Sequence, residues 1–239
     1  MFQTISDIFG NTNTAEERGR VRAMSKSGNI VIEPEKESYY QLNDLRSHKF
    51  GDSGFSVDPF DALWLFAGDD AETLSKTANT ERIRAFLPGL NFSSKLTAEV
   101  TLSSLYFKSE LGLGFVYMIR RDTEAVGMII VESPKYNAVA INLRVWTVEF
   151  FLVESVEHIG LMYNSLKVVL GQLRRMGANC VMALCFPDNK ECANLMKYDL
   201  FESIDEMKFT TMSGDIHPSV SVANFSGAKL DELPVDAAH

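Results

Sequence analysis

The alternation of strand and helix patterns between Arg144 and Phe201 constrains the fold of this chain more than any other feature of its sequence. The patterns predict a strand, a glycine-bearing loop, a helix, a second strand and a second helix, over residues 144–153, 154–160, 161–176, 179–186 and 189–200. A loop that leads directly into a helix presents several unpaired backbone N–H groups, and the helix dipole adds partial positive charge there. That combination suits the pyrophosphate group of a ligand.

The rest of the sequence predicts helices first and an antiparallel meander after them. Helical spacing and capping residues predict helices over 58–68, 80–87 and 95–110, with Asp58 as the cap of the first and Pro59 in its first turn. Period-two patterns predict strands over 113–121, 125–132, 138–153, 202–211 and 218–225. We expect a bulge in the strand over 138–153.

This layout predicts an α+β fold with a single mixed, mostly antiparallel central sheet flanked by helices. We see no clear linker within it. We therefore expect a flexible or docking arm over residues 1–35, one domain over 36–226, and a frayed tail over 227–239.

The composition limits the classes of function. A formal net charge of −9 argues against a nucleic-acid partner and is compatible with a cationic substrate such as an amine. No apolar run approaches the roughly 20 residues that span a bilayer, and no basic signal segment opens the chain, so we expect a cytoplasmic protein without membrane contact. The three cysteines are Cys180, Cys185 and Cys192, and their spacing does not match a metal site. We therefore expect no metal.

With Gly160 in the loop, the order of elements resembles the cofactor half of the GNAT superfamily of acetyl-CoA-dependent N-acetyltransferases. In that family the pyrophosphate loop has Gln or Arg, two free positions, Gly, one free position, and Gly or Ala. This chain has Gly160 in the first glycine position, Glu157 in place of Gln or Arg, and Met162 in place of the small residue. The resemblance implies that acetyl-CoA is the co-substrate and that its pyrophosphate binds along the loop: His158, Ile159, Gly160, Leu161 and Met162.

Two of these residues depart from the family in ways that matter physically. The Glu157 carboxylate repels a pyrophosphate, and Met162 adds bulk where the backbone would approach its ligand. Gly160 is equally consistent with a plain turn between strand and helix. His158 is either a possible catalytic proton carrier near neutral pH or a solvent-exposed loop residue.

The residues after the second strand resemble the ribosomal-protein (Rim-like) branch of the same superfamily. That branch has Asn, two free positions, Ser, a helix and a closing Gly-Phe. Asn189 and Phe201 match, whereas Cys192 and Leu200 stand in the serine and glycine positions. The resemblance implies that Asn189 contacts the cofactor, while its residue type alone gives it another role, as the N-cap of the helix.

In this family the strand before the loop supplies the rest of the site. The resemblance implies that backbone groups of Phe151, Leu152 and Val153 bind the pantetheine arm of CoA and polarise the acetyl carbonyl. Glu149 is the one charged residue within 145–153. A desolvated glutamate has a raised pKa and can act as a general base for an amine; the alternative is a carboxylate on a solvated strand face.

Two functional hypotheses follow. The first is an N-acetyltransferase that moves an acetyl group from acetyl-CoA to a primary amine, a protein N-terminus or a small amine, by direct attack. The second is a catalytically degenerate GNAT-like fold that serves as a binding or structural protein. Under the first, strands 145–153 and 179–186 should part to admit the cofactor; under the second, Met162 or Glu157 would fill the space. A homodimer or a protein partner is compatible with either.

Overall fold

The computed structural model describes eleven segments of the chain, namely residues 21–25, 28–32, 45–134, 146–156, 159–178, 180–185, 189, 200–203, 209–211, 214–216 and 219–224. These segments leave out residues 190–199 of the helix expected over 189–200, the residues Glu157 and His158, the N-terminal residues 1–20, and the tail expected over 227–239.

A mixed sheet forms the centre of the described fold, and its eight strands run in the order β3-β4-β5-β6-β7-β8-β12-β9. Antiparallel pairing joins all neighbours except β7 and β8, which are parallel. The strands are His48–Lys49, Phe55–Pro59, Gly114–Arg121, Glu124–Glu132, Trp146–Leu152, Cys180–Cys185, Glu202–Ser203 and Ser219–Asn224, numbered β3 to β9 in chain order with the last as β12. The expected fold class, a mixed and mostly antiparallel sheet flanked by helices, is confirmed.

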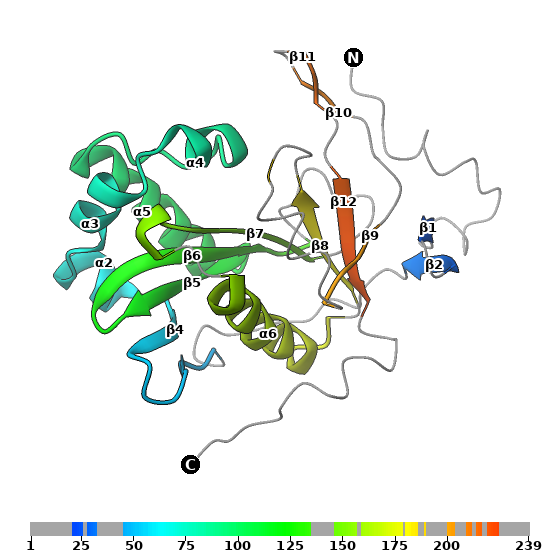
Figure 1. Ribbon diagram of the computed structural model, residues 1–239, viewed down its shortest axis with the longest axis horizontal. Coiled ribbons are helices and arrows are strands. Elements are labelled where there is room, and N and C mark those ends of the chain that lie inside the picture. The colour runs from blue at the N-terminus through cyan, green and yellow to red at the C-terminus, as the bar shows by residue number, and fades with distance from the viewer. Residues whose placement is uncertain are drawn as a thin grey trace.

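Helices cover both faces of this sheet (Figure 1). The group α2 to α5 precedes the meander in the chain, and α5 passes behind β5 and β6 in the view of Figure 1, while α6 lies in front. Their bounds are Ala62–Ala67, Asp70–Thr77, Glu81–Phe86, Lys95–Glu110 and Ile159–Arg175 for α2 to α6. The helix predicted over 95–110 is confirmed to the residue, because Ser94 and Thr97 form a reciprocal capping box at its start.

The helix start predicted at Asp58 and Pro59 is wrong. Both residues belong to β4, which pairs with β5 as far as Pro59 opposite Tyr117. The N–H of Phe60 then donates to the carbonyl of Val116, which keeps the chain extended for one more residue. Asp61 is the cap instead, because its carboxylate accepts from the two backbone N–H groups that open α2.

The strand predicted over 202–211 is also wrong as a single element. Its first residues form β9 on the main sheet, whereas Phe209–Thr211 forms β10 and pairs with β11, Gly214–Ile216, in a separate two-stranded sheet. Another two-stranded sheet joins β1, Val21–Ser25, to β2, Gly28–Ile32, within the segment expected to be an arm. The domain boundaries themselves stay predictions.

One buried ion pair ties the helices to the sheet. The guanidinium of Arg120, on β5, donates to both carboxylate oxygens of Asp70, on α3, at 2.7 Å each. Both side chains are almost fully buried. The same guanidinium lies 3.6 Å from the ring centroid of Trp64, on α2. Because it is planar and bidentate, this one side chain fixes two helices against one strand.

We predict that Arg120→Leu destabilises the protein by about 3–5 kcal/mol, because it leaves the Asp70 carboxylate buried without its partner. Urea unfolding followed by circular dichroism measures the loss. The matched control is Arg121→Leu, which removes an exposed pair with Glu124 at 2.9 Å and should cost about 1 kcal/mol or less. Similar losses in the two variants would contradict the role given to Arg120.

Candidate functional site

The central sheet opens between its two parallel strands. Pairing joins Trp146, Thr147 and Val148 of β7 to residues 181–183 of β8 and then stops. Beyond that point β7 continues to Leu152 beside β6 alone, and β8 continues to Cys185 beside β12 alone. The carboxyl ends of β7 and β8 therefore part at the edge where the sequence analysis expects a cofactor.

The expected bulge is not found in the described part of its strand, since β7 keeps an unbroken register with β6 from Thr147 to Leu152. A register shift lies one strand away, between β5 and β6 after Ile119. Gly127 of β6 keeps β7 close, because a Cβ at this position would come within 2.6 Å of Leu152 and of the Phe151 carbonyl. The opening therefore arises because β8 departs from a regular β7.

Backbone groups of β7 alternate between β6 and the opening. The N–H of Val153 donates to the carbonyl of Val126 at 2.9 Å, which directs Val153 and, by alternation, Phe151 toward β6. Leu152 faces the opposite way, and its carbonyl accepts from the guanidinium of Arg82 at 2.8 Å. Of the three residues predicted to contact a pantetheine arm, Leu152 has the carbonyl directed toward the opening, and Arg82 already binds it.

Sequence reasoning missed Arg82. It lies in the first turn of α4 and contacts β7 across 70 positions of sequence. Its neighbours Glu81 and Arg84 are exposed charged residues of the same short helix. No local pattern distinguishes an arginine that reaches a distant backbone carbonyl from one that points to solvent.

The side chains of Phe151, Leu152 and Val153 are buried in the apolar core. The ring of Phe151 lies 5.9 Å from that of Phe92, centroid to centroid. These residues are therefore held firmly, and what they can offer a ligand is their backbone.

Glu149 lies within the part of β7 that has left β8, opposite Ile130 of β6. Its side chain is exposed to solvent, yet surrounding protein displaces enough water to raise the pKa of its carboxyl to about 7. The charge of Glu132 raises that pKa further, whereas Lys108, bound to Glu132 at 3.2 Å, opposes the shift. A carboxyl with a pKa near 7 can accept a proton near neutral pH.

The raised pKa predicts a pH-dependent loss of stability. The carboxyl titrates near 4.5 when unfolded and near 7 when folded, so between these values the folded state binds more protons and the free energy of unfolding falls as pH rises. Glu149→Gln removes this titration. Its free energy of unfolding, relative to that of wild type, should therefore be higher at pH 8 than at pH 5. Urea unfolding at both pH values tests this, with Glu154→Gln as an exposed control. The prediction would be contradicted if the difference in free energy of unfolding between wild type and Glu149→Gln were the same at both pH values.

Helix α6 begins at Ile159, two residues earlier than predicted, and Gly160 is half-buried in its first turn. Leu161 and Met162 are buried in the core. The bulk of Met162 therefore packs into the protein interior rather than into the space ahead of the helix. This answers one of the two objections that the sequence raises to a ligand at this helix start; the other, Glu157, lies outside the described residues, as does His158.

Asn189, the residue predicted from the Rim-like branch, is half-buried in the described structure. It follows the carboxyl end of β8, whose last residue is Cys185. Its place in the chain is therefore on the β8 side of the opening, and its predicted contact with a cofactor stays a prediction.

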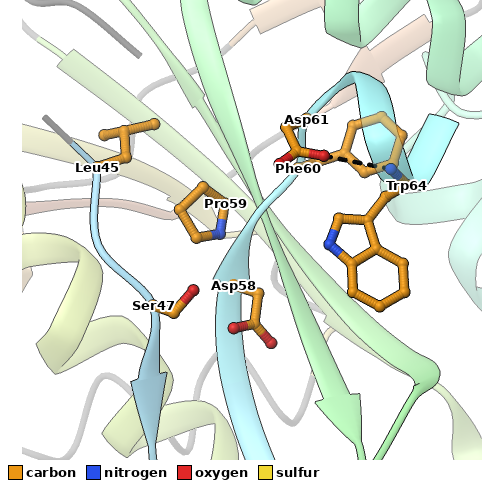
Figure 2. A pocket seen from close by; sticks show the side chains of 7 residues that line it. All are labelled: Leu45, Ser47, Asp58, Pro59, Phe60, Asp61 and Trp64. Carbon is orange, nitrogen blue, oxygen red and sulfur yellow. Dashed lines mark hydrogen bonds between the residues drawn. The ribbon is translucent and has the colours of Figure 1, made fainter. Parts of the chain in front are cut away.

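A separate pocket lies at the far edge of the sheet, beside β3 and β4 (Figure 2). Its volume is about 480 Å³, and its lining combines carboxylates with apolar side chains: Leu45, Ser47, Asp58, Pro59, Phe60, Asp61 and Trp64. In the view of Figure 2, Asp58 lies between Ser47 and Trp64. Both carboxylates already have partners, since Asp58 accepts from Ser56 and Asp61 caps α2. No pattern in the sequence indicates this pocket.

The described segments contain no cluster of three or more His, Cys, Asp or Glu side chains suited to a metal ion. None of their helices is long and apolar enough to cross a membrane.

Comparisons of the whole chain with known proteins rest on structure alone. No protein-family model matches the sequence, and no curated protein matches it. Solved structures do match. The chain is similar to the ribosomal-protein-S5-alanine acetyltransferase from Vibrio fischeri, with a TM-score of 0.55 and 15% sequence identity over 74% of this chain and 97% of that one.

Two further solved structures resemble the chain equally well. One is RimL, a ribosomal alpha-N-protein acetyltransferase in its apo form, with a TM-score of 0.57 and 17% identity over 71% of this chain and 90% of that one. The other is the microcin C7 self-immunity acetyltransferase MccE in complex with acetyl-CoA and AMP, with a TM-score of 0.56 and 12% identity over 73% and 93%. At these identities the similarity shows the fold, which is the GNAT acyl-CoA N-acyltransferase fold.

Proposed function

We propose that this protein is an N-acetyltransferase that moves an acetyl group from acetyl-CoA to a primary amine, either a protein N-terminus or a small amine. The observation that supports this most is the parting of β7 and β8 after Val148 and Ala183, with the first turn of α6 following β7. Solved structures of the same fold include one with acetyl-CoA and one with coenzyme A.

Each end of the opening would hold a different part of the cofactor. The first turn of α6, with Gly160, offers free backbone N–H groups and a positive dipole end to the pyrophosphate. Backbone groups of β7 that face away from β6, at Leu152 and by alternation at Phe150, would line the pantetheine arm. Asn189, which follows the carboxyl end of β8, would add a polar contact from that side.

Glu149 is the residue that we assign as general base. Its carboxyl, with a pKa of about 7, takes a proton from the substrate ammonium and leaves a neutral amine. Acetyl-CoA would supply the acetyl group as a thioester. The amine nitrogen forms a bond to the acetyl carbon and the C–S bond breaks. The leaving CoA thiolate then takes the remaining amine proton, which gives the neutral amide and the CoA thiol. Backbone N–H groups beside the opening stabilise the negative charge that develops on the carbonyl oxygen. His158 stays a second possible proton carrier.

The acceptor class follows from charge. The chain carries a net charge of −9, and Glu132 and Glu149 lie close enough to influence each other's ionisation. A cationic amine is attracted to such a surface before it loses its proton. The similar ribosomal-protein acetyltransferases act on protein N-termini according to their names, which supports a protein or small amine as the acceptor here.

A catalytically degenerate, GNAT-like binding or structural protein is the second candidate, and one observation favours it. The Arg82 guanidinium occupies the Leu152 carbonyl, the backbone group that a pantetheine arm would meet at the opening. If this contact persists, the Leu152 carbonyl is not available to CoA, and the fold would serve a partner instead.

Thermal unfolding with acetyl-CoA and with CoA tests whether the cofactor binds. A ligand at about 100 times its Kd should raise the Tm by about 5 °C or more if it binds only the folded state. Gly160→Trp should abolish this rise, because the indole fills the space in front of α6. If the cofactor raises the Tm of Arg82→Ala but not that of wild type, the binding or structural role is favoured, and the Arg82 contact with Leu152 is what prevents cofactor binding. No rise in either protein would overturn the acetyltransferase proposal.

The pH dependence of catalysis tests the role of Glu149. We predict that kcat/KM for acetylation of an amine panel rises with pH through an apparent pKa near 7, since the base must be deprotonated. Glu149→Gln should lower kcat by about 10²- to 10⁴-fold and abolish this limb of the profile. Acetyl-CoA binding by the variant, measured by the same Tm shift, should be retained. A full rate in Glu149→Gln would remove Glu149 from the mechanism.

A further inference from the structure

The exposed apolar surface of the described chain is concentrated on two neighbouring helices. Six large hydrophobic side chains are more than half exposed, and all of them lie on α2 or along α5 and its C-cap: Leu63, Phe66, Leu96, Val100, Phe107 and Leu111. Helix α2 lies beside α5. Single exposed hydrophobics are ordinary, but a contiguous group marks an interaction surface.

Helix α5 has two apolar sides that face opposite ways. Its inner side consists of Ala98, Leu102, Leu105 and Ser109, which are buried against the sheet and α3. At 100° per residue, the outer hydrophobics all fall within about 60° of one another, on the side away from this buried set. We call them, with the two serines between them, the outer stripe: Leu96, Val100, Ser103, Ser104, Phe107 and Leu111. A surface helix normally presents charged and polar residues there.

The outer stripe is symmetric about its own centre. Read from the midpoint between Ser103 and Ser104, each apolar residue on one side has an apolar counterpart at the same distance on the other. Val100 corresponds to Phe107, and Leu96 corresponds to Leu111. An isologous two-fold interface needs this property, because each residue of the patch must meet its counterpart on an identical patch.

We propose that the outer stripe of α5 joins two copies of this chain, with the two α5 helices antiparallel across a two-fold axis at Ser103 and Ser104. The small serines let the helix axes approach at the centre. Val100 of each copy packs on the partner's Phe107, a small side chain against a large one, and Leu96 packs on the partner's Leu111 at each end. This inference rests on the fold alone and does not depend on the proposed acetyltransferase activity.

The charges beside the stripe set the conditions for association. Glu99 and Glu110 border the same edge of α5, and in the antiparallel arrangement Glu99 of one copy lies near the partner's Glu110. Lys108 borders the other edge and is engaged with Glu132 of its own chain. Like charges along one edge weaken the dimer at low salt, and screening should strengthen it. A second copy is therefore favoured by the apolar pairing and opposed by two symmetry-related pairs of carboxylates.

Sedimentation velocity between 1 and 200 µM tests the proposal. We expect a reversible monomer–dimer equilibrium that shifts toward dimer when NaCl is raised from 50 to 500 mM. Phe107→Glu should abolish the dimer, and circular dichroism should show unchanged folding because the side chain is 58% exposed. Glu99→Lys should tighten the dimer by placing a lysine near the partner's Glu110. Its charge-matched control is Glu81→Lys, on α4, which should leave the equilibrium unchanged.

A crosslinking experiment tests the symmetry axis itself. In the proposed dimer, Ser104 of each copy lies close to the axis, so the Ser104→Cys variant should form a covalent dimer on mild oxidation. The Ser93→Cys variant places a thiol at the start of α5, far from the axis, and should behave as wild type does. A monomer at 200 µM in high salt would overturn the proposal. A dimer that persists in the Phe107→Glu variant would also overturn it. If the protein is a monomer and Phe107→Glu lowers only the turnover of the acceptor, the stripe binds the acceptor and the proposal is again overturned.

Discussion

The separation of β7 from β8 is the constraint on which the rest of this structure depends. Two parallel strands pair over three residues and then diverge, although each keeps its antiparallel neighbour on the other side. Unpaired backbone groups at a strand edge must find other partners, because leaving them buried and unbonded is costly. In this protein the Leu152 carbonyl finds Arg82. A ligand that enters the opening must either use the remaining backbone groups or displace that guanidinium.

Two arginines hold the helical layer in place over the sheet, and they act differently. Arg120 is buried and bound to Asp70 through both of its terminal nitrogens, with the Trp64 ring stacked beside it, so it fixes α2 and α3 on β5. Arg82 is only half-buried and makes a hydrogen bond from α4 to the end of β7. The first contact is a buried, bidentate ion pair, whereas the second joins a half-buried side chain to one backbone carbonyl.

Helix α5 connects the candidate active site with the candidate interface. Its Lys108 binds Glu132 and lowers the pKa of Glu149, against the larger rise that burial causes. Its outer stripe, which Lys108 borders, would be covered in a dimer.

The sequence by itself determined the local elements and their order. Capping residues fixed the ends of α5, and period-two patterns identified β5 and β6, because these signals depend only on near neighbours in the chain. It failed at Asp58 and Pro59, where a good cap sequence is overridden by pairing with β5. It failed again over 202–211, where one β pattern divides between two sheets. Only the tertiary structure decided where β7 and β8 part, that Arg82 reaches Leu152, that Met162 points into the core, and that the pKa of Glu149 rises to about 7. Each of these depends on residues distant in sequence that share one small volume, which no local pattern encodes.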